Sequence, residues 1–262
     1  MGPASVASEL GRITLEVVPP AARIALRHAP HNVIDVAMME ELAAALAEIE
    51  IRPDVSAIVI SGHGKAFSAG VDVAAHVPDK IEEMLAKFDA VIRTFVASKK
   101  VTIAAVHGPC LGGGAELAMV CDLVYTTDTA QWGFPEIKLG CYPPVACTAL
   151  AALVGQKRAA ELILTGRTIS GEEAAEIGLA TRAVPEGELS AAVEECLDGL
   201  RKLSPVALAV TKKASYAWDS MHFDKGLARA ERLYLDDLMK TEDAQEGIRA
   251  FMEKREPKWT GK

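Results

Sequence analysis

Two glutamates and two glycine-rich segments have the residue types and spacing that acid–base chemistry at an activated carbonyl requires. Residues 65–72 read KAFSAGVD, and residues 107–116 read HGPCLGGGAE and end on Glu116. Neither segment has the G-x-G-x-x-G spacing of a dinucleotide site or the G-x-x-x-x-G-K spacing of a P-loop. Consecutive glycines can simply allow close packing of a helix on a strand. At a helix N-terminus they also expose N–H groups that bind an oxyanion, and the turn at residues 69–71 can supply a second donor.

Glu116 falls in the first turn of the helix that follows the second glycine segment. The helix dipole favours an ionised carboxylate there, so we expect a base near neutral pH; an exposed first-turn acid without a role is the alternative. Glu136 follows Trp132, Phe134 and Pro135. Burial beside these side chains would raise its pKa and suit it to an acid role, whereas a solvated position would make it an ordinary loop acid.

Strand–helix alternation in the first half of the chain predicts an α/β class with parallel pairing. A turn at Pro19-Pro20 joins the first two strands, and Asp35 is the expected N-cap of the first helix. We expect strands over 13–17, 22–26, 57–60, 101–106 and 123–125, and helices over 36–49, 81–96 and 111–120.

The chain after Pro143 is predicted to be mostly helical. The expected helices cover 149–153, 157–164, 171–177, 189–203, 205–239 and 244–254. The run over 205–239 carries Trp218, Met221 and Phe223 and is too long to pack wholly on a small domain. It either extends the core or docks on a neighbouring subunit, and we favour the second interpretation.

Composition indicates a globular protein of 262 residues, half of them apolar, with a net charge of −8. Nucleic-acid binding is disfavoured because it needs a clustered basic face. The start of the sequence lacks a signal-peptide pattern, and no apolar run approaches the roughly 20 residues of a membrane span. We therefore expect a cytoplasmic protein with no membrane partner. No metal site is expected either, since no cysteines have zinc-ligand spacing; small buried thiols are expected at Cys110, Cys121, Cys141, Cys147 and Cys196.

Four segments together resemble the enoyl-CoA hydratase/isomerase (crotonase) superfamily, over residues 13–259. They read FSAGVD, HGPCLGGGAELAMVCDLVY, AQWGFPEIKLG and LTGRTISGEEAAEIGLATRAV. The resemblance implies a spiral of ββα turns over residues 1–204, which holds the active site, and a C-terminal helical region over 205–262 that builds trimers or pairs of trimers. It also implies an acyl-CoA substrate and no separate cofactor.

The resemblance assigns roles to individual residues. The backbone N–H groups of Val71 and Gly113 would hold the thioester carbonyl, while Glu116 as base and Glu136 as acid add water across a double bond. Isomerases of the superfamily typically keep only the later carboxylate, so retention of both favours hydration. The resemblance also implies that seven residues bind substrate or CoA: Asn32, Ala69, Gly70, Asp72, Gly112, Phe251 and Lys254. Phe251 and Lys254 would lie near the CoA nucleotide, commonly the nucleotide bound by an adjoining subunit.

The loop after Glu136 departs from the usual hydratase pattern. A glycine-rich LGxxPGAGGTQRL is typical, whereas residues 139–150 read LGCYPPVACTAL. Prolines in place of glycines stiffen the loop and predict an acyl pocket formed by Tyr142, Pro143 and Pro144. Together with HNVID at residues 31–35, this loop resembles cyclohexa-1,5-diene-1-carbonyl-CoA hydratases of anaerobic aromatic degradation.

The sequence therefore predicts a hydro-lyase acting on a cyclic dienoyl-CoA. The alternatives are a 2-enoyl-CoA hydratase of fatty-acid β-oxidation, an enoyl-CoA isomerase, and a non-catalytic module that binds acyl-CoA or RNA. The acidic charge and the two retained glutamates disfavour the last of these.

Overall fold

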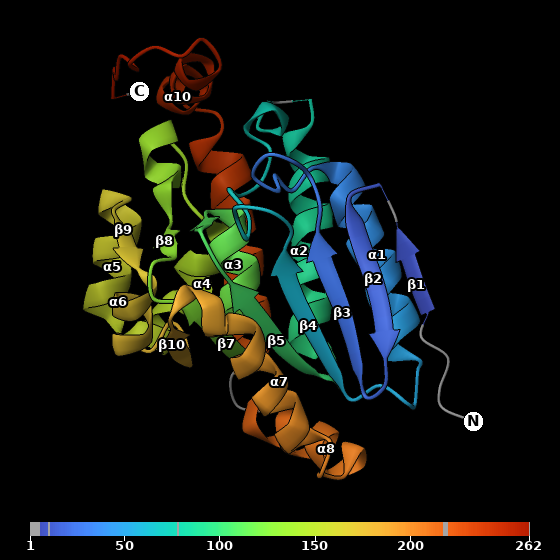
Figure 1. Ribbon diagram of the computed structural model, residues 1–262. Helices are drawn as coiled ribbons and strands as arrows, with labels where there is room; N and C mark the ends of the chain where they lie inside the picture. Colours follow the sequence, from blue (N-terminus) through green and yellow to red (C-terminus); the bar gives the residue numbers. More distant parts are fainter. Residues whose placement is uncertain (1–5, 10, 78, 217–219, 262) are drawn as a thin grey trace.

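A seven-stranded sheet forms the centre of the computed structural model, which describes residues 6–9, 11–77, 79–216 and 220–261 (Figure 1). The strand order is β1-β2-β3-β4-β5-β7-β10. The first three strands pair antiparallel, and β3, β4, β5, β7 and β10 pair parallel. Their bounds are Val6–Glu9 (β1), Ile13–Val18 (β2), Ala21–Leu26 (β3), Ala57–Gly62 (β4), Val101–Val106 (β5), Leu123–Thr127 (β7) and Arg182–Val184 (β10).

Helices cover both faces of the sheet, which explains why its central strands are continuously apolar. Side chains alternate along β4, so Ile58 and Ile60 join one buried cluster while Ala57 and Val59 join another. The first cluster includes the apolar faces of α1 (Val36–Glu50) and α2 (Ile81–Ala97). The second includes α7 (Leu189–Leu200), and α8 (Pro205–Tyr216) also packs on β5.

The expected cap of α1 is present. The Asp35 carboxylate accepts a hydrogen bond of 2.9 Å from the N–H of Met38, satisfying one of the otherwise unpaired donors of the first turn. The apolar face of α1, with Met39, Leu42 and Leu46, is then buried against the sheet.

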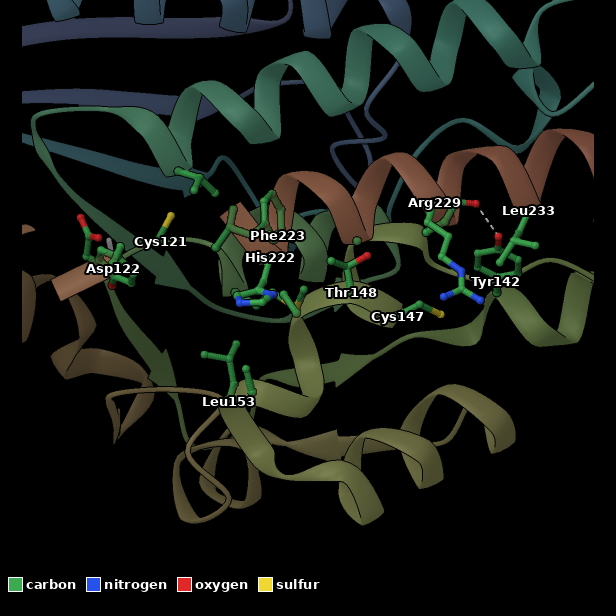
Figure 2. A pocket seen from close by; sticks show the side chains of 18 residues that line it. Cys121, Asp122, Tyr142, Cys147, Thr148, Leu153, His222, Phe223, Arg229 and Leu233 are labelled. Carbon is green, nitrogen blue, oxygen red and sulfur yellow. Dashed lines mark hydrogen bonds between the residues drawn. The ribbon is translucent and has the colours of Figure 1, made fainter. Parts of the chain in front are cut away.

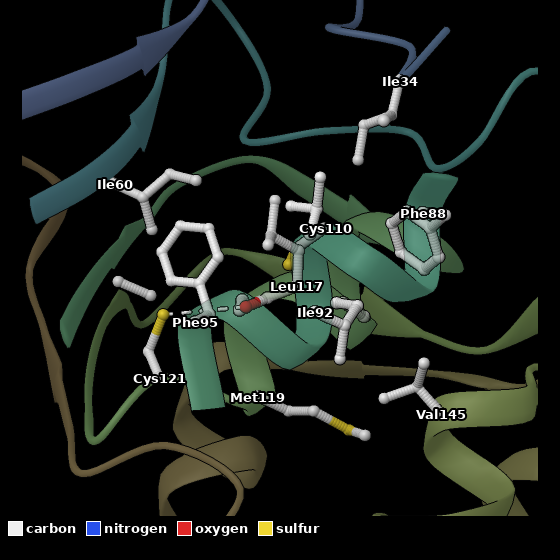
Figure 3. Close-up of a cluster of buried hydrophobic side chains, with 14 of the residues drawn as sticks. Ile34, Ile60, Phe88, Ile92, Phe95, Cys110, Leu117, Met119, Cys121 and Val145 are labelled. Atoms are coloured by element: carbon white, nitrogen blue, oxygen red, sulfur yellow. Dashed lines mark hydrogen bonds between the residues drawn. The ribbon is translucent and has the colours of Figure 1, made fainter. Parts of the chain in front are cut away.

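A small second sheet carries the segments that hold the predicted site residues. Its strands are β6 (Pro109–Leu111), β8 (Gln131–Gly133) and β9 (Thr168–Ser170). The first leads into α3 (Gly113–Met119) and the second into the 3-10 helix η2 (Pro135–Leu139). Leu117 of α3 and Cys110 of β6 pack with Ile92 and Phe95 of α2 in one buried apolar cluster (Figure 3). This packing fixes the position of α3.

Eight further helical segments in the described part of the chain complete the fold. They are the 3-10 helices η1 (Val73–Ala75) and η3 (Glu186–Glu188), the helices α4 (Pro144–Val154), α5 (Gln156–Thr165), α6 (Gly171–Glu176), α9 (Ser220–Arg232) and α10 (Glu242–Met252), and the π-helical segment η4 (Leu233–Leu238). Among the described helices, α9 packs on α4 and α2, and α10 packs on η1 and η2. No described helix is long and apolar enough to cross a bilayer.

The α/β class with C-terminal helices is confirmed, and several local expectations need correction. Within the helix expected over 205–239, the structure describes α8 up to Tyr216 and α9 from Ser220, with residues 217–219 outside the described residues. The end of this run is the π-helical η4 rather than α-helix, which corrects the expectation there. Trp218 lies outside the described residues. Helix α3 begins at Gly113 rather than at residue 111, because residues 109–111 form β6. Of the five cysteines, three are buried as expected, whereas Cys147 is exposed and Cys196 is only partly buried.

Candidate active site

Two backbone N–H groups lie where the glycine segments approach each other. Gly70 has φ +105° and Gly112 has φ +52°, conformations that favour glycine. A Cβ on Gly113 would lie 3.4 Å from the Val71 nitrogen, so the two donor-bearing residues are adjacent. Among the hydrogen bonds between described residues, none uses the N–H of Val71 or Gly113. Both donors therefore remain available for an oxyanion.

Glu116 lies in the first turn of α3 with its carboxylate buried. Its Oε1 accepts a 2.9 Å hydrogen bond from the N–H of Ala146 in α4. Burial raises the pKa of Glu116 to about 7, opposed by the hydrogen bonds from the backbone of Ala146 and Val145. Desolvation therefore outweighs the stabilisation of the ionised form that its first-turn position was expected to give. A pKa near 7 still suits a general base at neutral pH.

Glu136 approaches the same place from η2 rather than from an irregular loop. Its Oε1 would lie 2.6 Å from a Cβ on Gly112, so the carboxyl rests directly over that glycine. Its Oε2 is buried and contacts no donor in the described part of the chain. Burial, followed by the negative charge of Glu116, raises the pKa of Glu136 well above its ordinary value. The sequence prediction of a raised pKa for this residue agrees with the structure.

A cavity of about 80 Å³ brings these groups together. Both glutamates and both donor residues line it, as do the predicted Ala69, Gly70 and Gly112 and the predicted acyl-pocket residues Tyr142, Pro143 and Pro144. The cavity also includes side chains that no motif indicated: Phe88 of α2, Tyr234 of η4 and Ile248 of α10. Tyr234 is buried, and its ring lies edge-on to that of Tyr142 with 5.1 Å between centroids. No local sequence pattern indicates that Tyr234 lines the cavity, because its position there depends on how η4 packs.

Comparison with known proteins agrees with this geometry. The family model described as enoyl-CoA hydratase/isomerase matches residues 21–262. The chain belongs to the enoyl-CoA hydratase/isomerase family. It is 37% identical over 231 residues to a probable enoyl-CoA hydratase of Mycobacterium tuberculosis, covering 87% of this chain and 90% of that protein. It is 33% identical over 255 residues to the cyclohexa-1,5-dienecarbonyl-CoA hydratase of Thauera aromatica, covering 97% and 98%.

Solved structures show the same fold. A crystal structure of an enoyl-CoA hydratase from Mycobacterium avium subsp. paratuberculosis superposes with a TM-score of 0.87 at 26% identity, covering 96% of this chain and all of the other. A family structure from Xanthobacter autotrophicus gives 0.85 at 30% identity, covering 94% and 98%. The predicted crotonase-like architecture is thereby confirmed.

Asn32 and Asp72 lie beside the site but are not among the described residues that line its cavity. The buried Asn32 amide donates to the carbonyls of His63, Ala66 and Phe67, at 2.9, 2.8 and 3.2 Å. It thus holds the loop that leads to the oxyanion donors. The Asp72 carboxylate accepts from the N–H of Ala74 at 3.0 Å and caps η1.

Phe251 and Lys254 lie on the protein surface near the end of α10, outside the cavity as the described residues define it. Phe251 is 52% exposed. This position is open to a CoA nucleotide held at the surface, and that role for the two residues stays a prediction.

The pKa values of the two glutamates predict a bell-shaped pH dependence of kcat/KM. A base whose pKa is raised to about 7 is ionised only above that pH, so the rate should rise through about pH 7. An acid whose pKa is also raised stays protonated at neutral pH and loses its proton at higher pH, where the rate should fall. Initial rates across about pH 5 to 10 measure both limbs. If kcat/KM instead rose through about pH 4.3, the ordinary pKa of a glutamate, the base would not be a buried carboxylate with a raised pKa.

Proposed function

We propose that this family member is an enoyl-CoA hydratase, a carbon–oxygen lyase, whose preferred substrate is a cyclic dienoyl-CoA thioester. The observation that carries the reaction type is the convergence of Glu116 and Glu136 on one small cavity beside two unpaired backbone donors. One carboxyl must accept a proton from water and the other must deliver a proton to carbon. A pKa of about 7 lets Glu116 act as the base at neutral pH, and a pKa raised well above the ordinary value keeps Glu136 protonated as the acid.

The geometry suggests how each group acts. The N–H groups of Val71 and Gly113 polarise the thioester carbonyl and stabilise the enolate as negative charge develops on its oxygen. A water molecule held between the carboxyls loses a proton to Glu116 as its oxygen bonds to the β-carbon. Glu136 then protonates the α-carbon, and proton exchange between the two closely spaced carboxyls restores their starting states. Because both carboxyls line the same small cavity, we expect water to add to one face of the double bond.

The loop at residues 141–144 supports the cyclic substrate. Pro143 and Pro144 restrict its backbone, and Tyr142 is held against Tyr234, so the acyl compartment has fixed walls. A flat six-membered ring loses little conformational freedom on entering such a compartment, whereas a linear chain must be ordered. The relative from Thauera aromatica, named for a cyclic dienoyl-CoA substrate, is similar to this chain over almost its entire length.

A panel of CoA thioesters tests this proposal. The purified protein is incubated with cyclohexa-1,5-dienecarbonyl-CoA, crotonyl-CoA and a longer linear 2-enoyl-CoA, and products are followed by mass. We expect the cyclic thioester to gain one water with the highest kcat/KM. Efficient hydration of crotonyl-CoA with no reaction of the cyclic thioester would overturn the substrate assignment. Double-bond migration without a gain in mass would overturn hydration in favour of isomerisation.

The assembly and CoA contacts implied by the family form part of the same proposal. We propose that the C-terminal helices build a trimer or a pair of trimers, in which Phe251 and Lys254 lie near the CoA nucleotide of an adjoining subunit. Phe251 in the last turn of α10 and Lys254 just after this helix are both exposed, which is consistent with contacts outside their own chain.

A further inference from the structure

A second and larger cavity lies next to the candidate active site. It occupies about 590 Å³ between α4 and α9, within the range of about 300–1,000 Å³ typical of small-molecule sites. Its walls are mainly apolar and include Met119, Ala149, Leu153, Phe223 and Leu233. Figure 2 shows Tyr142 and Arg229 at one end of this cavity and Cys121 and Asp122 at the other. It has about seven times the volume of the 80 Å³ catalytic cavity.

Tyr142 is the point at which the two cavities meet, since its side chain lines both. Two contacts fix its position. Its hydroxyl donates a 2.6 Å hydrogen bond to the carbonyl of Ala230 on α9 (Figure 2). Its ring also lies at 81° to that of Tyr234. Because one contact holds the ring and the other holds its polar tip, the side chain cannot rotate away without losing both.

We infer that Tyr142 is the residue that limits the size of the acyl group, by separating the catalytic compartment from the large apolar cavity beyond it. This inference rests on the proposed function, because it concerns which acyl-CoA thioesters reach the glutamates. With Tyr142 in place, a compact acyl group fits and a long chain meets an aromatic wall. Removing the ring joins the two cavities into one continuous apolar space between α4 and α9.

The inference predicts a change of specificity that depends on chain length. Each methylene that moves from water into an apolar cavity strengthens binding by about fourfold. In Tyr142→Ala, the ratio of kcat/KM for 2-decenoyl-CoA to that for crotonyl-CoA should therefore rise at least about tenfold. Tyr142→Phe keeps the ring and loses only the hydrogen bond to Ala230, so its ratio should change much less.

A blocking variant makes the test specific to the second cavity. Ala152 is exposed on α4 and lines only the large cavity, so Trp at this position should fill the space without touching the glutamates. Ala152→Trp alone should leave crotonyl-CoA turnover as in the parent. Combined with Tyr142→Ala, it should abolish most of the gain on decenoyl-CoA. A gain that survives the block would show that the chain takes another path, and would overturn the inference.

Binding of saturated thioesters separates this inference from the proposed reaction. Butyryl-CoA and decanoyl-CoA lack the reactive double bond, so calorimetry on the purified variants reports acyl accommodation without turnover. We expect Tyr142→Ala, or Tyr142→Leu should the alanine variant fail to fold, to tighten decanoyl-CoA binding relative to butyryl-CoA by at least about tenfold. An unchanged ratio of affinities would overturn the role of Tyr142. Absence of hydration of every unsaturated thioester would instead overturn the hydratase assignment.

Discussion

Replacing either Glu116 or Glu136, the proposed acid–base pair, with glutamine is expected to lower kcat for hydration by about 10²–10⁴, equivalent to about 3–5 kcal/mol of barrier. Glutamine keeps the shape of the side chain but can neither accept the proton of water nor deliver one to carbon. Glu116→Gln retains an amide oxygen that can accept the 2.9 Å hydrogen bond from Ala146, so the variant should fold. The double variant should be little worse than either single one, because the two carboxyls act as a unit.

Glu172→Gln is the matched control for this experiment. Glu172 is also a first-turn helix acid, in α6, but it is exposed and lines neither of the two cavities described above. Its replacement should leave kcat unchanged. Affinity for a saturated acyl-CoA should persist in all these variants, which separates loss of chemistry from loss of binding. Turnover by Glu116→Gln within about tenfold of the parent would show that Glu116 is not the base.

The residues of the candidate site could be predicted from the sequence because each lies in a short contiguous motif. The glycines before Glu116 and the aromatic segment before Glu136 are local patterns, and the fold brings both to one cavity as predicted. The pKa of Glu116 could not be predicted in the same way. Its direction depends on burial, which raises the pKa more than the hydrogen bond from Ala146, 30 positions along the chain in α4, lowers it. A first-turn position specifies a dipole, while tertiary packing specifies the desolvation that outweighs it.

The sequence did not predict features that arise from strand pairing and from the packing of helices. Strands such as β6 and β9 have three residues each and exist only because partners in the small sheet complete their hydrogen bonds. The helical pattern over 205–239 has no strong breaker, yet its two halves pack on different elements. Lys212 of α8 donates to the Lys100 carbonyl, whereas Arg93 of α2 pairs with Asp224 and Glu231 of α9. Tyr234 lies in η4, directly after α9, and lines the candidate active site because of how these helices pack.

Gly113→Ala is expected to lower kcat by about 10²–10³, the loss typical of one oxyanion-hole donor. A Cβ at this position would lie 2.5 Å from Cγ2 of Val71 and 3.2 Å from Cζ of Phe88. Val71 is β-branched and has few alternative rotamers, so its backbone must shift to relieve the contact. That shift moves one donor relative to the other. Since both donors act mainly on the developing enolate, kcat and kcat/KM should fall together while KM changes little.

Gly199→Ala on α7 is the control that distinguishes a displaced donor from a general effect of an added methyl group. Nothing lies within 4 Å of a Cβ at Gly199, so this variant should keep full activity. The pH dependence separates the two kinds of active-site defect. Gly113→Ala leaves both carboxyls in place, so its kcat/KM should keep the limb near pH 7, whereas Glu116→Gln should lose that limb. A Gly113→Ala enzyme with unchanged kcat would mean that the carbonyl is polarised by groups other than the Val71 and Gly113 donors.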